Sequence, residues 1–415
     1  MRQVFRITAL LVLALPPVPA DEIPAHILNL ARIERKMTAE LKRLPDYTCL
    51  ETISRYTAAQ GGKMKPYDRI RIDVAIVDGK ELYSWPGAKS FDDRGLGAMV
   101  NNGFLSDGDF SAMSRNIFMH RTAAITFAGE VAEGSRNLFR YDFHIPQRVS
   151  GWQLRARNST GVVGAKGSFW VDAGTLDLVR LRFSAEDLPP FSQDKGLDED
   201  AAYGRVRIGS EEVLLPLVVD LESESFNGTR YLNHATFSGC RQYGSESTIS
   251  FADGATPAPA PMPALPPRED AALPGGIEIA LRLDTPIDSA HAAVGDEIRA
   301  VVSKAVKFGE EVVLPRGAVV SGVIRRLDRH TGNVPYYEVG LEFNEAESGG
   351  RRVVVLGKPG DVTPFTGFHR NAVGFATVAG DRPSPGVGYF YVEGESIRIP
   401  RGVSFTLLTQ NVRAR

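Results

Sequence analysis

Histidine is the side chain most often found in metal sites, and this sequence contains seven of them. They are His26, His120, His144, His234, His291, His330 and His369. Metal-binding histidines usually recur as HxH or HExxH, or alternate with cysteines, because a site needs several ligands close together. No such spacing occurs along the chain, so the sequence predicts no metal site.

Sequence motifs of catalytic sites are missing as well. There is no G-x-S-x-G elbow, no P-loop and no dinucleotide fingerprint. The chain has 50 acidic residues, so no single carboxylate pair stands out as a hydrolytic site. Asp198-Glu199-Asp200 could suggest a cation site, but the run belongs to the polar stretch SQDKGLDED, which we interpret as a solvated loop. We therefore expect no catalytic residue, no cofactor and no enzymatic activity.

The two cysteines, Cys49 and Cys240, are far apart in the sequence, which excludes a catalytic CxxC pair. In an exported protein an even pair predicts one disulfide, with two unpaired buried thiols as the alternative. Closing so long a loop contributes about 4–5 kcal/mol in the chain-entropy model.

The first twenty residues predict export. Arg2 and Arg6 precede a short apolar run, and Val18-Pro19-Ala20 offers small residues for cleavage before Asp21. This pattern is typical of a secretory signal peptide, with an uncleaved anchor as the alternative. No later segment approaches a membrane-spanning run, and the net charge of −2 argues against nucleic acid as a partner.

A proline-rich stretch, ATPAPAPMPALPPRED at residues 255–270, divides the chain. Alternating Ala and Pro favour extended polyproline II, which could hold two bodies roughly 30 Å apart. A proline-rich ligand for a partner domain is the alternative interpretation. We expect a signal peptide at residues 1–20, a first domain at 21–252, a linker at 253–272 and a second domain at 273–415.

The first domain begins with a helix and continues with strands. Leu30, Ile33, Met37, Leu41 and Leu44 recur at helical spacing up to Pro45. Alternating residues then predict a hairpin at YDRIRIDVAIVDGKELYSW, one or two short helices within residues 94–120, and further strands. We expect a curved antiparallel half-barrel with helices on its concave side.

This order of elements resembles the LolA-like family of periplasmic lipoprotein carriers, and the hairpin GSFWVDAGTLDLVRL at residues 167–181 is the best match. The resemblance implies an apolar cavity between sheet and helices that takes acyl chains, with a filled core as the alternative. The two cysteines are not part of the family pattern. Three tryptophans could stack on a ligand, although packing is the usual role at such hairpins: Trp85, Trp152 and Trp170.

The second domain repeats a turn. Pro274-Gly275-Gly276, Pro315-Arg316-Gly317 and Pro400-Arg401-Gly402 each precede a β run, and such turns at short spacing suggest a small barrel or sandwich. The run from Leu273 to Gly322 resembles the β-barrel domain of TrbI-like conjugation and type IV secretion proteins. The residues that carry this resemblance are Leu273, Pro274, Gly276, Leu283, Thr285, Ser289, Val294, Gly295, Asp296, Leu314, Pro315, Gly317 and Gly322.

Together these features predict a mainly β, exported bacterial protein of the periplasm or outer membrane. We expect the first domain to bind an apolar ligand, either lipid or an acylated protein, and the C-terminal barrel to contact envelope proteins. The alternative is a structural component of an envelope or secretion assembly with no small ligand.

Overall fold

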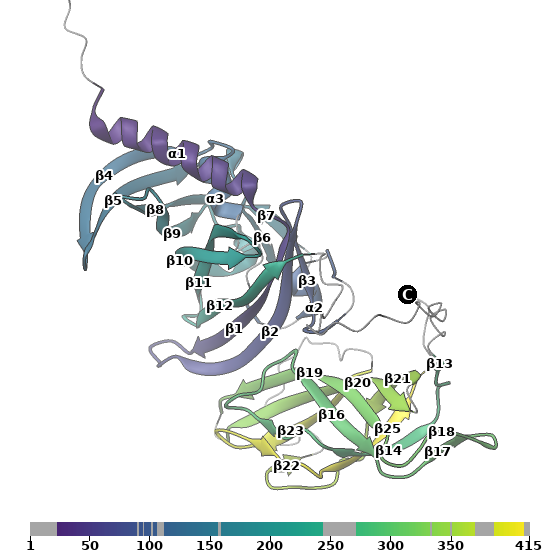
Figure 1. The fold of residues 1–415 in the computed structure, drawn as a ribbon. Coiled ribbons are helices and arrows are strands. Elements are labelled where there is room, and N and C mark those ends of the chain that lie inside the picture. Colours follow the sequence, from purple (N-terminus) through teal and green to yellow (C-terminus); the bar gives the residue numbers. More distant parts are fainter. Residues whose placement is uncertain are drawn as a thin grey trace, which may run out of the picture.

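The computed structural model describes residues 23–410, except 89–90, 94, 101–102, 106–111, 157–158, 244–270, 333, 349–350 and 370–385. The predicted signal peptide and almost all of the proline-rich linker lie outside the described residues, so both stay predictions. Two large β units dominate the chain, as the sequence predicts (Figure 1). Among the described residues, no helix is long and apolar enough to cross a membrane.

The first unit is a ten-stranded antiparallel sheet. Its strand order is β3-β2-β1-β12-β11-β10-β9-β8-β5-β4. The strands are β1 (Tyr47–Ala58), β2 (Lys65–Val77), β3 (Lys80–Ser84), β4 (Ala124–Glu133), β5 (Arg136–Ile145), β8 (Gly164–Asp172), β9 (Leu178–Glu186), β10 (Asp194–Ile208), β11 (Glu211–Ser225) and β12 (Arg230–Gln242). A separate hairpin joins β6 (Gln153–Ala156) to β7 (Ser159–Val162). Two short 3₁₀ helices, η1 (Gln147–Val149) and η2 (Pro190–Ser192), lie in the connections.

Strand β2 illustrates why this part of the chain forms a sheet. Ile70, Ile72 and Val74 alternate with polar residues and are fully buried, which is the period-two pattern of a half-covered strand. Asp78 and Gly79 then both adopt positive φ, 51° and 73°. Two such residues make the hairpin turn whose twist matches the flanking strands. The predicted hairpin is therefore confirmed.

In the described part of the chain, three α-helices accompany the sheet: α1 (Ala25–Arg43), α2 (Leu96–Met99) and α3 (Ala112–Phe118). In α1 the apolar stripe of the sequence is buried at Ile33, Met37 and Leu41, and the helix ends just before Pro45. Helices α1 and α3 share one hydrophobic cluster with β5, β8 and β9, so both cover the same face of the sheet (Figure 1). The short helices expected within residues 94–120 are confirmed.

The disulfide between Cys49 and Cys240 is confirmed. It joins β1, the first strand of the unit, to β12, the last strand, and these two strands are neighbours in the sheet. The covalent loop therefore encloses all ten strands.

The second unit is a small β-barrel, as expected. Six strands close into a ring in the order β14-β16-β19-β20-β21-β25, with β25 pairing back to β14. They are β14 (Glu278–Leu283), β16 (Glu297–Val302), β19 (Val319–His330), β20 (Tyr336–Ser348), β21 (Arg351–Pro359) and β25 (Ser404–Thr409). Short strands extend it: β13 (Ala271–Ala272), β15 (Ile287–Asp288), β17 (Val306–Phe308), β18 (Glu311–Leu314), β22 (Phe368–His369), β23 (Gly388–Glu393) and β24 (Arg398–Ile399).

The repeated Pro-x-Gly turns form the corners of this barrel. Gly276, Gly317 and Gly402 have φ of 91°, 87° and 95°, a region that glycine occupies without strain. Each turn leads into a barrel strand: β14, β19 and β25. The sequence pattern thus predicted both the turn and the element that follows it.

The two units are in direct contact rather than held apart. The Arg71 N–H donates to the Val294 carbonyl at 2.8 Å, and the Val294 N–H donates to the Arg69 carbonyl at 2.7 Å. One cluster of buried hydrophobic residues also continues from β2 into the barrel. The proline-rich composition predicted an extended linker that could hold two bodies apart. A linker sets only the largest distance between two domains, however, and does not prevent them from packing together.

Candidate functional site

The face of the sheet under α1 is filled with aromatic side chains. Tyr141 and Phe169 stack with ring centroids 5.3 Å apart, and Phe118 of α3 meets Phe169 edge-on at 5.2 Å. All three rings are fully buried. At this central position the structure has the filled core that was the alternative to a cavity.

The cover is incomplete at the N-terminal end of α1. Along its apolar stripe, Ile33 is fully buried, Leu30 is half-buried, and Ile27 is 49% exposed. Ile23, just before the helix, is 59% exposed. The stripe therefore continues beyond the edge of the aromatic face, where apolar surface stays in contact with water.

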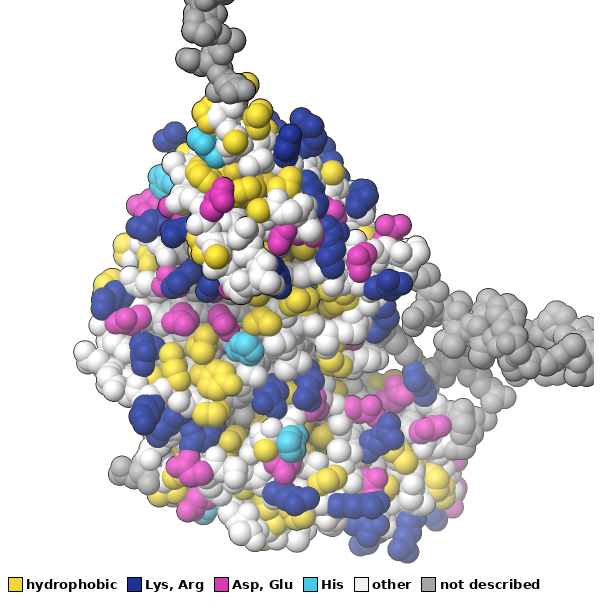
Figure 2. Space-filling view, turned by 60° about the vertical axis from the view of Figure 1, so that its left-hand side comes forward, with side chains coloured by type: hydrophobic (Ala, Val, Ile, Leu, Met, Phe, Trp, Pro, Cys, Tyr) yellow, Lys and Arg dark blue, Asp and Glu magenta, His cyan; other side chains and the backbone are white. Residues whose placement is uncertain are grey.

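The edge strand β4 and its neighbour β5 supply aromatic rings at this end. The imidazole of His26 stacks on Phe127 with centroids 5.1 Å apart, and Phe127 meets Phe139 at 6.5 Å. Both phenylalanines are only half-buried. We call the apolar edge formed by Ile27, Leu30, Phe127 and Phe139, with His26 across it, the α1–β4 rim. Figure 2 shows hydrophobic side chains gathered at the end of the molecule where the described chain begins.

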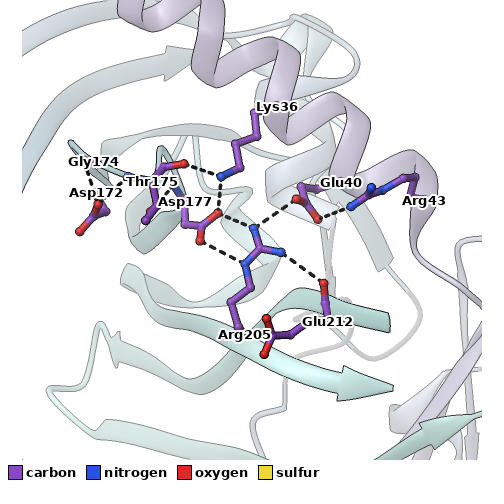
Figure 3. A network of polar contacts seen from close by, with 9 residues as sticks. All are labelled: Lys36, Glu40, Arg43, Asp172, Gly174, Thr175, Asp177, Arg205 and Glu212. Atoms are coloured by element: carbon purple, nitrogen blue, oxygen red, sulfur yellow. Dashed lines mark hydrogen bonds and ion pairs between the residues drawn. The ribbon is translucent and has the colours of Figure 1, made fainter. Parts of the chain in front are cut away.

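An ionic network holds the other half of α1 (Figure 3). Lys36 lies 2.7 Å from the Asp177 carboxylate, and Arg205 of β10 contacts both Asp177, at 2.5 Å, and Glu40, at 3.1 Å. Burial alone raises the pKa of Asp177, but hydrogen bonds from Arg205 and Lys36 outweigh it, so the pKa lies below its usual value. We call these four residues the α1 clamp.

The hairpin at residues 167–181, on which the family resemblance rests, positions one residue of the α1 clamp. Asp172 accepts hydrogen bonds from the N–H groups of Gly174 and Thr175, at 3.0 and 2.8 Å. These bonds shape the turn between β8 and β9 and lower the pKa of Asp172, the bond from Thr175 most. The turn carries Asp177 to the underside of α1. The clamp therefore fixes the C-terminal half of the helix, and the Tyr141 hydroxyl of β5, which donates to the His26 carbonyl at 3.0 Å, holds its first turn.

A second polar cluster lies where the sheet meets the barrel, and we call it the seam. Arg55 and Asp68 form an ion pair with side chains only 2% and 1% exposed. From β2, the Tyr67 hydroxyl donates to the Asp328 carboxylate of β19 at 3.1 Å. Burial, with the nearby Asp68, raises the pKa of Asp328 to about 7, against the lowering effect of Arg326 and Arg55.

The Val-Gly-Asp run of the barrel forms the rest of the seam. Val294 makes the backbone contacts to β2, and Asp296 binds Arg71 through both oxygens at 2.6 and 2.7 Å. Gly295 has φ of 100°, and a Cβ there would lie 2.2 Å from the Arg71 carbonyl oxygen. Only glycine allows the sheet to approach so closely. This motif thus joins the units, a role that its turn-like pattern did not reveal.

Among the described residues, the structure brings together one set of metal-type ligands that the sequence did not indicate. Ligand atoms of Asp328, His330 and Glu338 lie within 4.8 Å of one another. Asp328 and His330 are two apart on β19, and Glu338 faces Asp328 on β20. Arg326, however, lies 3.5 Å from Asp328 and 3.3 Å from Glu338, so a guanidinium already supplies the positive charge there. This donor set therefore fits a metal ion poorly.

The acidic run at residues 198–200 is not a loop, which corrects the interpretation of the sequence. It belongs to β10, where Arg180 binds Asp200 at 2.7 Å and Glu199 is buried. Acidic side chains within a strand escape sequence analysis because their cross-strand partners are distant in the chain. The Arg180 guanidinium thus already balances the charge of the Asp200 carboxylate.

The tryptophans pack against the protein's own side chains. Trp152 meets Phe183 edge-on at 5.0 Å, and Trp85 lies under the Arg325 guanidinium at 4.5 Å. The Trp170 ring has Arg140 and Arg180 over it, at 5.6 and 5.4 Å. These contacts match the packing role rather than ligand stacking.

In the barrel motif, Thr285 and Ser289 also have structural partners. Their hydroxyl oxygens accept backbone N–H groups, from Arg299 at 3.1 Å and from Ile397 at 2.9 Å. The leucines of the motif, Leu273, Leu283 and Leu314, are buried. The motif therefore specifies the fold of the barrel and its contact with the sheet.

Comparison with known proteins gives matches to solved structures alone, since no family model and no curated protein matches the chain. A LolA superfamily protein from Nitrosomonas europaea has 12% identity over 54% of this chain and 97% of its own, with a TM-score of 0.28. An outer membrane lipoprotein-sorting protein domain from Vibrio parahaemolyticus has 10% identity over 52% and 93%, with a TM-score of 0.31. A DUF1329 family protein from Desulfovibrio piger has 11% identity over 54% and 93%, with a TM-score of 0.29. At this level of similarity we transfer no function from them.

Proposed function

We propose that this chain is a non-enzymatic bacterial envelope protein whose N-terminal unit binds an apolar ligand. The ligand class is the acyl chain of a lipid or of an acylated protein. Its binding site is the α1–β4 rim. Export through the predicted signal peptide supports a periplasmic or outer-membrane location.

The observation that carries this proposal is the gradient of burial along α1. The same apolar stripe is fully buried at Ile33 and 49% exposed at Ile27, with half-buried Phe127 and Phe139 beside it. Covering such a surface with hydrocarbon is favourable by about 25 cal/mol per Å² of apolar area. A flexible chain lying along the stripe would extend the buried face without displacing the aromatic core.

The barrel has a separate role in this proposal: it contacts an envelope protein. The resemblance to TrbI-like barrels supports this assignment, and the seam fixes the barrel in one orientation relative to the ligand site. When the barrel contacts an envelope protein, the α1–β4 rim would thereby face the partner that supplies or receives the ligand.

The test uses the mature full-length chain, purified from a periplasm without detergent, extracted with organic solvent and analysed by mass spectrometry. We expect co-purifying lipid near one molecule per chain. Ile27→Asp should lose it, because a carboxylate in the rim opposes burial. Phe308→Asp is the matched control, since Phe308 is an exposed apolar residue of the barrel at 58%.

Two results would count against the proposal. One is equal lipid on the Ile27→Asp variant, which would move the site elsewhere. The other is no lipid on the unmodified chain even after lipid is offered, which would favour a structural component without a ligand.

A further inference from the structure

The outward side of α1 carries a row of six exposed side chains, four of which are basic. Its members recur every three or four positions and therefore lie along one side of the helix. They are Leu28, Arg32, Arg35, Ala39, Lys42 and Arg43, and every one is exposed. The row is opposite the buried stripe of Ile33, Met37 and Leu41. We call it the basic ridge.

No carboxylate interrupts the basic ridge. The two acids of the helix, Glu34 and Glu40, lie off the row and are half-buried, and Glu40 belongs to the α1 clamp. Arg43 pairs with Glu40 at 3.5 Å. Within the described part of the chain, neither Arg32 nor Arg35 has an ion-pair partner. Two guanidinium groups thus face solvent on a protein whose net charge is −2.

Apolar side chains continue the basic ridge at its N-terminal end. Ile23 and Leu28 are 59% and 44% exposed there. The helix lies along the outside of the sheet at one extremity of the molecule, so nothing of the barrel shields it (Figure 1). Figure 2 shows Lys and Arg side chains near this end, close to hydrophobic ones.

We infer that the basic ridge docks on the surface of an anionic phospholipid bilayer. A helix with cationic and apolar side chains on one exposed side can lie in the lipid interface, with the cations at the phosphates and the apolar residues among the acyl chains. Nucleic acid would use the cations but would leave the exposed Ile23 and Leu28 without a partner. The apolar end of the ridge therefore favours a bilayer.

This inference goes beyond the proposed ligand site because it uses the opposite side of the helix. Bilayer docking through Arg32 and Arg35 requires no acyl chain in the α1–β4 rim, and ligand binding requires no bilayer. Experiments can therefore refute bilayer docking without refuting ligand binding at the α1–β4 rim, and the reverse.

The experiment is sedimentation of the mature full-length chain with vesicles of phosphatidylglycerol and phosphatidylcholine, compared with pure phosphatidylcholine. We expect binding to the anionic vesicles alone, weakened by salt because the charges are exposed. In the double variant Arg32→Gln/Arg35→Gln, the affinity for anionic vesicles should fall about 30-fold. Each basic residue near an anionic surface contributes about 1 kcal/mol to binding, and two are removed. The control, Lys307→Gln/Arg316→Gln, removes the same charge from exposed barrel positions and should bind like the unmodified chain.

A third variant, Leu28→Asp, should also weaken binding while leaving the ligand measurement of the α1–β4 rim unchanged. Equal binding to neutral vesicles, or equal weakening in the barrel control, would overturn the inference. So would binding to heparin without binding to anionic vesicles, which would assign the basic ridge to an acidic polymer instead.

Discussion

The hydroxyl of Tyr67 in the N-terminal sheet donates a hydrogen bond to the carboxylate of Asp328 in the barrel, at 3.1 Å. These residues are far apart in the chain, on opposite sides of the proline-rich linker. Because Asp328 is almost completely buried, the bond belongs to the interior of the molecule. The bond therefore ties the two units together through a buried carboxyl group.

Titration of Asp328 should make the free energy of unfolding depend on pH. With its pKa raised to about 7, the folded protein keeps a proton that the unfolded chain releases near pH 4. Stability from this group is thus fully present below about pH 4 and is lost as pH rises through about 7. The groups that face Asp328 are Tyr67, Asp68, Arg326, Arg55, His330 and Glu338.

Asp328→Asn should remove this dependence, because an amide does not titrate. Urea unfolding of both proteins from pH 4 to pH 8 measures the effect. We expect similar stability at pH 4 and a more stable variant at pH 8. A difference that does not change with pH would contradict the raised pKa.

Loss of the α1 clamp should loosen the helix. Arg205→Ala leaves Asp177 and Glu40 without their shared guanidinium and should cost about 1 to 3 kcal/mol. Hydrogen exchange should accelerate along α1 more than in the barrel, since the clamp fixes only the helix. Arg207→Ala, on the same strand, is the matched control. Unchanged exchange in α1 would show that the aromatic core alone holds the helix.

Cutting the linker should not separate the units. The composition of residues 253–272 predicts protease cleavage into two stable pieces, and the seam predicts that they remain together in size-exclusion chromatography. Arg71→Glu, which places a carboxylate opposite Asp296, should release them. Separation of the unmodified pieces would show that the seam is weaker than its contacts suggest.

Reduction of the disulfide should destabilise the N-terminal unit. The bond between Cys49 and Cys240 closes a loop around the whole sheet, so its removal should cost about 2–5 kcal/mol. Cys49→Ala/Cys240→Ala, unfolded in urea beside the oxidised protein, measures this. Equal midpoints would indicate that packing alone holds β1 against β12.

Local patterns in the sequence predicted much of the fold. The alternation of Ile70, Ile72 and Val74, the Asp78-Gly79 turn and the Pro-x-Gly corners all depend on neighbouring residues, which sequence analysis can read. The seam could not be predicted, because Tyr67 and Asp328 meet only after both units have folded. The same reason hid the charge partners of Asp200 and the grouping of His330 with Glu338.

The candidate site was predictable only in outline. The apolar stripe of α1 was evident from Leu30, Ile33 and Met37, but periodicity cannot show where along a helix its cover ends. That depends on the position of β4, whose Phe127 lies about a hundred residues further along the chain. The basic ridge likewise acquires meaning only once the opposite side of the helix is known to be buried.

An acyl chain bound at the α1–β4 rim can be located by photo-crosslinking of the mature full-length chain with a fatty acid that carries a diazirine, followed by peptide mapping. We expect label on the peptides that contain Ile27, Phe127 and Phe139, and its loss in Ile27→Asp. Label confined to the barrel, or no saturable label at all, would contradict it.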